Sequence, residues 1–208
     1  MRPFLAFDTS TDHIALAIGD LDAPGSRLAI ADFRAPRAAN TVVLLAVERL
    51  LESIGLAPAA LAAVAVGRGP GSFTGVRIGA ATAKGLAHGL GVPLVGFGTL
   101  DAVAHAAKAE GLIGVLGDAM RGEVYPALFR AHAGSAVRLT TDRVARPAEI
   151  AEEWAALDER ILLTGNGLAK HEAAFAGGLG ERATLAAEGV RTPDGESLLA
   201  AAWAEMGE

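Results

Sequence analysis

The sequence predicts an α/β protein built from two similar halves. Apolar runs rich in β-branched or aromatic residues alternate with longer stretches of helical periodicity, the pattern of a sheet flanked by helices. The order strand, aspartate, turn, strand, followed later by strand, glycine-rich turn, helix, occurs twice. We therefore expect a first lobe over residues 1–100 and a second, smaller lobe over residues 101–194, with a last helix over residues 195–206 free to pack back on the first.

The first half is predicted to begin with an antiparallel meander. Its three apolar runs are joined by the turns Thr9-Ser10-Thr11-Asp12 and Asp22-Ala23-Pro24-Gly25, so consecutive strands lie next to each other. Helical and buried-strand patterns then alternate, and Gly55 ends the first helix. The predicted elements are strands over residues 3–8, 13–19 and 27–34, a helix over 41–54, a strand over 61–67, a helix over 75–90, a strand over 93–97 and a helix from 99 to about 110.

The second half is predicted to repeat this order in shorter form. Its first strand leads into Asp118 as the first strand of the chain leads into Asp8, and Gly165-Asn166-Gly167 forms a glycine turn before a helix. The predicted elements are strands over residues 112–117 and 123–130, a helix over 147–157, a strand over 161–164, a helix after residue 167 and the last helix over 195–206.

Composition excludes several classes of protein. With 208 residues, 51% of them hydrophobic, the chain can form a packed core, so disorder is excluded. Its apolar stretches are too short and too interrupted to span a bilayer, and Met1-Arg2-Pro3 leads straight into a strand rather than a signal peptide. We therefore expect a cytoplasmic protein without membrane association.

The charge balance bears on nucleic acids. A net charge of −6 argues against autonomous RNA binding, which needs clustered cations. Contact with RNA that is bound mainly by a partner protein remains an open alternative. The candidate residues for such a contact form a local basic patch of Arg34, Arg37, Arg77 and Lys84.

The most specific segment is a glycine-rich loop between a predicted strand and a predicted helix, running from Gly67 to Gly79. Its glycines allow close backbone approach, and hydroxyls and free N–H groups at a helix start can cap the helix or hold an anion. The loop lacks both the Walker ending Gly-Lys-Ser/Thr and the pattern Gly-x-Gly-x-x-Gly. Two interpretations stay open, a turn that only reverses the chain and an anion site. The candidate residues of that site are Gly69, Gly71, Ser72, Thr74 and Gly75.

A second candidate lies at the end of the first predicted strand. Asp8, Thr9 and Ser10 could hold a metal-bound phosphate, or they could form a turn in which the side chains satisfy the local backbone. Asp118 occupies the matching position of the second lobe, and two such aspartates facing one cleft would flank a nucleotide.

Conventional catalytic groups are missing from the sequence. There is no cysteine, no two of the five histidines are three, four or five residues apart, and no Gly-x-Ser-x-Gly elbow occurs. We predict neither a metal site nor catalytic residues, and peptidase activity is not supported.

The two long helices of the first lobe indicate a protein interface. Six apolar residues in a row, Val42 to Val47, leave Val42, Leu44 and Leu45 without obvious cover. In the helix after the glycine loop, small residues including Ala80 permit close packing. Exposed apolar helix surface typically marks a protein interface.

Three segments together resemble the TsaB (YeaZ) family, whose members take part in making threonylcarbamoyladenosine on tRNA. They are Phe7-Asp8-Thr9-Ser10-Thr11, the stretch from Arg68 to Gly79, and Asp118-Ala119-Met120-Arg121-Gly122-Glu123-Val124-Tyr125. The match runs in order from residue 4 to about residue 130 and is thin beyond it.

The resemblance implies an actin/sugar-kinase/Hsp70-like fold with two ribonuclease-H-like lobes. It implies a non-catalytic subunit that binds and activates TsaD, the threonylcarbamoyltransferase, while the ATPase TsaE joins and tRNA is met only through the complex. It further implies homodimers when TsaD is absent, and ATP or ADP only at the level of the complex, with no certain cofactor here. The alternative is an ATPase or phosphotransferase using Asp8, Asp118 and the glycine loop. The implied interface residues are Thr41, Val42, Leu44, Leu45, Val76, Arg77, Ala80, Ala81 and Lys84.

Overall fold

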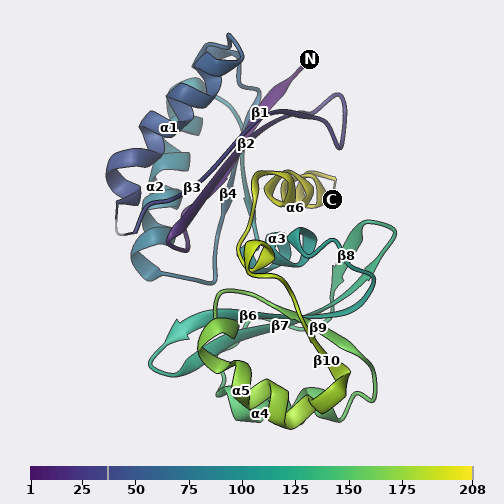
Figure 1. Ribbon diagram of the computed structural model, residues 1–208. Helices are drawn as coiled ribbons and strands as arrows, with labels where there is room; N and C mark the ends of the chain where they lie inside the picture. The colour runs from purple at the N-terminus through teal and green to yellow at the C-terminus, as the bar shows by residue number, and fades with distance from the viewer. Residues whose placement is uncertain (37, 208) are drawn as a thin grey trace. The chain divides into compact units, whose positions relative to one another are not determined.

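The computed structural model describes residues 1–36 and 38–207, which divide into two compact units (Figure 1). Unit 1 comprises Met1–Ala102 together with Pro193–Glu208, and unit 2 comprises Val103–Thr192. The C-terminal helix thus folds with the N-terminal strands. Each unit has a five-stranded mixed sheet of its own.

Unit 1 is built on a sheet with the order β3-β2-β1-β4-β5. The first three strands form the expected antiparallel meander, and β4 and β5 add parallel strands beside β1. Its elements are β1 Pro3–Asp8, β2 His13–Asp20, β3 Arg27–Arg34, α1 Ala39–Ser53, η1 Pro58–Ala60, β4 Ala63–Gly67, α2 Phe73–Leu90, β5 Leu94–Phe97, the first half of α3 Thr99–Ala106, and α6 Gly195–Met206.

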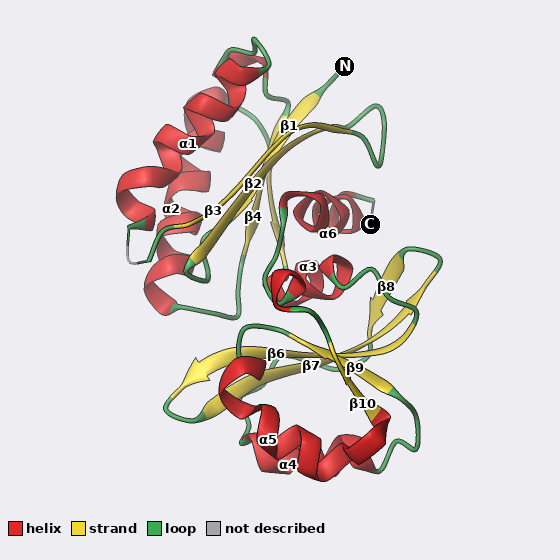
Figure 2. Cartoon of the chain, viewed as in Figure 1, coloured by secondary structure: helices red, strands yellow, loops and turns green. Residues whose placement is uncertain are grey.

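Helices cover both faces of this sheet, so its central strand is buried on both sides (Figure 2). Leu5 and Phe7 of β1 belong to the core formed with α1 and α2. Phe4 and Ala6, which point the other way because side chains alternate along a strand, belong to the core formed with α6. A continuous apolar run in β1 is therefore required, and it ends at Asp8, a buried polar residue.

Unit 2 repeats the topology of unit 1. Its sheet order, β8-β7-β6-β9-β10, is again third-second-first-fourth-fifth, with β6 antiparallel to β7 and parallel to β9. The expected duplication of topology is confirmed. The elements are the second half of α3, β6 Gly111–Met120, β7 Glu123–His132, β8 Ser135–Arg138, α4 Pro147–Ala155, β9 Ile161–Thr164, α5 Leu168–Leu179, η2 Gly180–Arg182, β10 Ala183–Leu185 and η3 Glu188–Val190.

The core of unit 2 lies between its sheet and the helices α4 and α5. Trp154 and Phe175 bring these helices together, with ring centroids 5.8 Å apart. Gly114 of β6 makes room for the Trp154 ring, because a methyl group there would collide with it.

Several predicted boundaries were wrong. The helix from Thr99 ends at Ala106 instead of about residue 110, and Lys108 beyond it has a positive φ of 45°. Asp118 does not end its strand, since β6 continues to Met120 after a register shift. The short edge strands β8 and β10 were not predicted, because three or four residues carry too little periodicity.

Candidate functional site

Asp8 is the buried centre of a hydrogen-bond network in unit 1. Only 1% of its surface is exposed. Its Oδ1 accepts a hydrogen bond of 2.6 Å from the backbone N–H of Ser10, and its Oδ2 accepts one of 2.6 Å from the Thr99 hydroxyl. The Thr99 oxygen in turn accepts from the N–H of Gly69 at 3.2 Å. The carboxylate therefore joins its own turn, the glycine loop and the start of α3.

The glycine loop packs directly onto the turn that follows β1. A methyl group at Gly67 would collide with the Asp8 carboxylate, and one at Gly71 or Gly75 would collide with the carbonyl oxygen of Ser10 or Thr9. Thr9 Oγ1 donates to the carbonyl of Gly75 at 2.8 Å, and Ser72 N–H donates to the carbonyl of Ser10 at 2.7 Å. These glycines are needed for close approach between two segments of the same unit.

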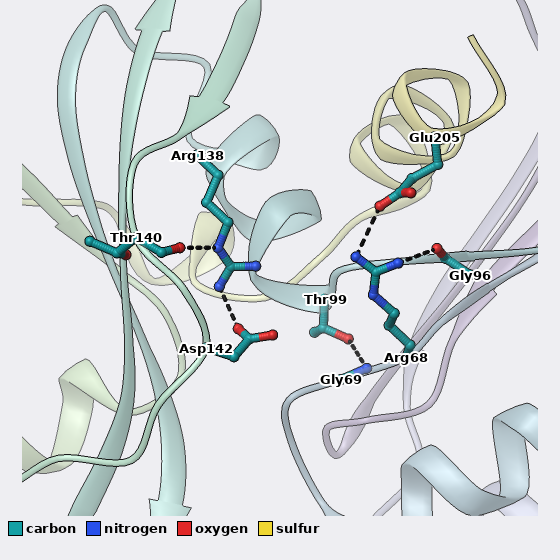
Figure 3. Close-up of polar contacts among 8 residues, drawn as sticks. All are labelled: Arg68, Gly69, Gly96, Thr99, Arg138, Thr140, Asp142 and Glu205. Carbon is teal, nitrogen blue, oxygen red and sulfur yellow. Dashed lines mark hydrogen bonds and ion pairs between the residues drawn. The ribbon is translucent and has the colours of Figure 1, made fainter. Parts of the chain in front are cut away.

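The start of α2 is capped from within the loop. Ser72 is the N-cap residue, and its hydroxyl accepts from the N–H of Gly75 at 3.3 Å. Arg68 holds the loop from the other side, donating to the carbonyl of Gly96 at 2.9 Å and pairing with Glu205 of α6 at 3.1 Å (Figure 3). Thr74, another candidate residue, is exposed.

One polar atom of this network has no partner. The Ser10 hydroxyl is buried, and no described residue forms a hydrogen bond with it. The structure thus brings together the unit 1 residues that the sequence singled out, and most of their polar groups bond to one another. Thr99, expected only to cap a helix, is the member of the network that sequence reasoning missed.

Asp118 lies in unit 2 and has a network of its own. Its Oδ1 accepts from the N–H of Met120 at 3.0 Å, in the same i to i+2 relation that joins Asp8 to Ser10. Its Oδ2 pairs with the Lys170 ammonium at 2.5 Å, and its own N–H donates to the Asn166 side chain at 2.9 Å. The repeated local geometry follows from the repeated topology.

The helix pair α1 and α2 covers one face of the unit 1 sheet (Figure 1). Val43 and Val47 are buried against the sheet, while Leu44 and Leu45 are 56% and 51% exposed. Phe73, at the start of α2, is 75% exposed and lies under the Arg77 guanidinium at 5.1 Å from the ring centroid. Sequence reasoning did not select Phe73, because it was assigned to the loop. Of the remaining implied interface residues, Thr41, Ala81 and Lys84 are exposed, and Val42, Val76 and Ala80 are half-buried.

The basic patch considered for RNA is described only in part. Arg34, Arg77 and Lys84 are exposed in unit 1, and Arg37 lies outside the described residues. Within the described part of the chain, no three His, Asp or Glu side chains are grouped so that they could hold a metal ion. No described helix is long and apolar enough to cross a membrane.

Two mixed sheets of the same strand order, each with an aspartate near the end of its first strand, define a protein of the actin and sugar-kinase fold. A ROK hexokinase from Thermus thermophilus shares this fold, with a TM-score of 0.52 at 14% identity over 97% of each chain. A model of the TsaD family, described as tRNA N6-adenosine threonylcarbamoyltransferase, matches residues 34–189. The chain belongs to this family. Among solved structures, it is similar to YeaZ.

YeaZ from Pseudomonas aeruginosa is 30% identical, with a TM-score of 0.83, and the match covers 100% of this chain and 93% of that one. A second Pseudomonas aeruginosa structure, titled an uncharacterized protein with similarity to peptidase YeaZ, gives 0.82 at 28% identity over the same shares. No curated protein matches the chain. The resemblance to the YeaZ family found in the sequence is thereby confirmed.

Proposed function

We propose that this chain is a non-catalytic partner subunit of TsaD in the formation of threonylcarbamoyladenosine beside the tRNA anticodon. It binds and activates the catalytic subunit through α1 and α2, forms homodimers through the same surface when TsaD is absent, and is joined by TsaE. It contacts tRNA only as part of the complex, and ATP or ADP is bound by the complex and not by this chain alone.

The observation that carries this proposal is the exposed apolar surface of the helix pair. Leu44 and Leu45 of α1 and Phe73 of α2 are large apolar residues, and each is more than half exposed. Removing such exposed apolar surface from water favours association, with an upper limit of about 25 cal/mol for each Å² buried. Small residues on α2, among them Ala80 and Ala81, permit a partner helix to approach closely.

The use of Asp8 supports the non-catalytic part of the proposal. Both carboxylate oxygens accept short hydrogen bonds from donors of the same unit, and the glycine loop fills the space next to them. This arrangement is suited to holding the loop in place. We infer that unit 1 has kept the architecture of a phosphate-binding fold as a structural support for α2, which begins at this loop.

The interface is tested by size-exclusion chromatography with purified TsaD. Leu44→Glu and Ala81→Glu should abolish co-elution, because each places a charge in a desolvated contact. Ala80→Glu should do the same, and the exposed Ala81 serves as the second site because Ala80 is half-buried. Val137→Glu is the matched control, since Val137 is 61% exposed on β8 of unit 2.

Unchanged co-elution of the Leu44 and Ala81 variants would disprove the interface. The non-catalytic role is tested separately, by incubating the isolated chain with threonylcarbamoyl adenylate and tRNA. Transfer by the chain alone would disprove that role, whereas stimulation of TsaD without intrinsic transfer would support it.

A further inference from the structure

Unit 2 contains a surface pocket of about 580 Å³ that the proposed function does not use. Three segments form it: the turn between β6 and β7, the start of α4, and the first half of α5. The turn contributes Arg121, the first residue of β7 is Glu123, Arg146 directly precedes α4, α4 contributes Ala148, and α5 contributes His171.

The two arginines of this pocket have no carboxylate partner among the described residues. Both Arg121 and Arg146 are exposed. Other arginines of unit 2 are engaged: Arg130 pairs with Glu159, Arg143 with Glu153, and Arg138 with Asp142 (Figure 3). Arg160 and Arg191 also lack a carboxylate partner among the described residues, so what distinguishes Arg121 and Arg146 is that both line one pocket.

Two other features of the pocket lining bear on ligand binding, the start of α4 and the ring of His171. At the start of α4 the Glu149 side chain accepts a hydrogen bond from the Arg146 N–H at 3.4 Å, and Pro147 has no N–H, so the helix start offers an anion only the N–H groups that follow Pro147. His171 adds a ring nitrogen, Nε2, that is buried and has no hydrogen-bond partner among the described residues. Buried polar atoms are rarely left unpaired, but this nitrogen has almost no accessible surface, so a ligand could reach it only after the His171 ring turns.

The backbone holds Arg121 at this position at a conformational cost. Met120 and Arg121 have positive φ values of 66° and 53°, and Gly122 follows at 83°. A residue other than glycine in this region costs about 1–2 kcal/mol. The two-residue loop Arg121-Gly122, between the paired residues Met120 and Glu123, requires these positive φ values and thereby fixes the position of Arg121.

We propose that this pocket binds the phosphate group of a small phosphorylated molecule. Two guanidinium groups match the fork geometry that phosphate oxygens accept, and the N–H groups of α4 that follow Pro147 are further donors. The pocket is larger than a phosphate ion, so it has room for an organic part. Glu123, the one carboxylate of its lining, is placed to accept a hydrogen bond from a hydroxyl of that part.

The test is a titration of the full-length ¹⁵N-labelled chain with inorganic phosphate, followed by NMR at constant ionic strength. Saturable shifts of the Ala148 and His171 amide signals are expected, and sodium chloride at equal ionic strength should not reproduce them. Arg121→Gln and Arg146→Gln should each weaken binding about tenfold or more. Arg160→Gln, an exposed arginine of the same unit outside the pocket, should leave binding unchanged.

Shifts that do not saturate, that chloride reproduces, or that survive in both pocket variants would overturn the proposal. Ribose 5-phosphate tests the organic part, and it should bind more tightly than inorganic phosphate. Equal affinity would disprove a role for Glu123 in binding a hydroxyl.

Discussion

The Thr99 hydroxyl donates a hydrogen bond of 2.6 Å to Asp8 Oδ2 across 91 residues of sequence. Both residues are about 98–99% buried, with exposures of 2% and 1%. Because the same oxygen also accepts from the Gly69 N–H, one hydroxyl satisfies a buried acceptor and a buried donor. The end of β1, the glycine loop and the start of α3 therefore depend on one side chain.

Replacing this hydroxyl should destabilise unit 1. Thr99→Val keeps the shape but leaves a carboxylate oxygen and the Gly69 N–H without this partner, and we expect a loss of about 2–4 kcal/mol in unfolding free energy. Thr99→Ser, which keeps the hydroxyl, should cost less than about 1.5 kcal/mol. Urea unfolding monitored by tryptophan fluorescence measures both, and equal midpoints for the two variants would show that the hydrogen bonds are not important.

Two glycines of α2 should respond in opposite directions to alanine. A methyl group at Gly75 would collide with the Thr9 carbonyl, so Gly75→Ala should destabilise by about 1–3 kcal/mol. Gly85 has nothing within 4 Å of the added methyl group, and Gly85→Ala should stabilise by about 0.5–1 kcal/mol because alanine favours a helix. Thermal unfolding by circular dichroism compares them, and a stabilising Gly75→Ala would contradict the close packing.

Sequence reasoning could predict what depends on local pattern. The apolar run of β1 indicated an internal strand, and the repeated strand, turn and helix order indicated the duplication that the two sheets confirm. The short strands β8 and β10 could not be found this way, since they are defined by pairing with β7 and β9.

At the site, too, local motifs could be predicted from the sequence and contacts between distant segments could not. The sequence singled out Asp8 and the glycine loop, and it left open whether they bind an anion or hold a turn. Which groups satisfy Asp8 depends on Thr99, whose distance along the chain hides the contact from any motif. Phe73 was assigned to the loop, and its exposure became visible only when α2 was found to begin there.

Asp32 should make stability depend on pH. Partial burial near the start of α6 and the charge of Asp194 raise the pKa of the Asp32 carboxyl, against the Gly195 N–H and His13, which lower it. With a raised pKa, the folded state binds the proton more strongly than the unfolded state, so this contribution to stability is lost as pH rises above the ordinary value of 3.8.

Asp32→Asn removes this ionisation and can still accept from Gly195. The stability of the variant relative to the parent should therefore increase between about pH 4 and pH 7, by a small amount because Asp32 is only partly buried and solvent screens its charge. Urea midpoints at three pH values give the difference, and a difference that stays constant or falls would contradict the raised pKa.

Phe73→Ala should separate folding from association. At 75% exposure the ring buries little surface within the chain, and its loss removes mainly the contact with Arg77, worth about 0.5–1 kcal/mol. The melting temperature should therefore change little. Aromatic anchors at an interface often contribute 2 kcal/mol or more, roughly thirtyfold in affinity, so binding to TsaD should weaken by at least about tenfold in a calorimetric titration.

Val137→Ala, which shortens a comparably exposed side chain in unit 2, should change neither the melting temperature nor the affinity for TsaD. A Phe73→Ala chain that unfolds more easily but binds normally would make the ring a folding residue and remove it from the proposed interface.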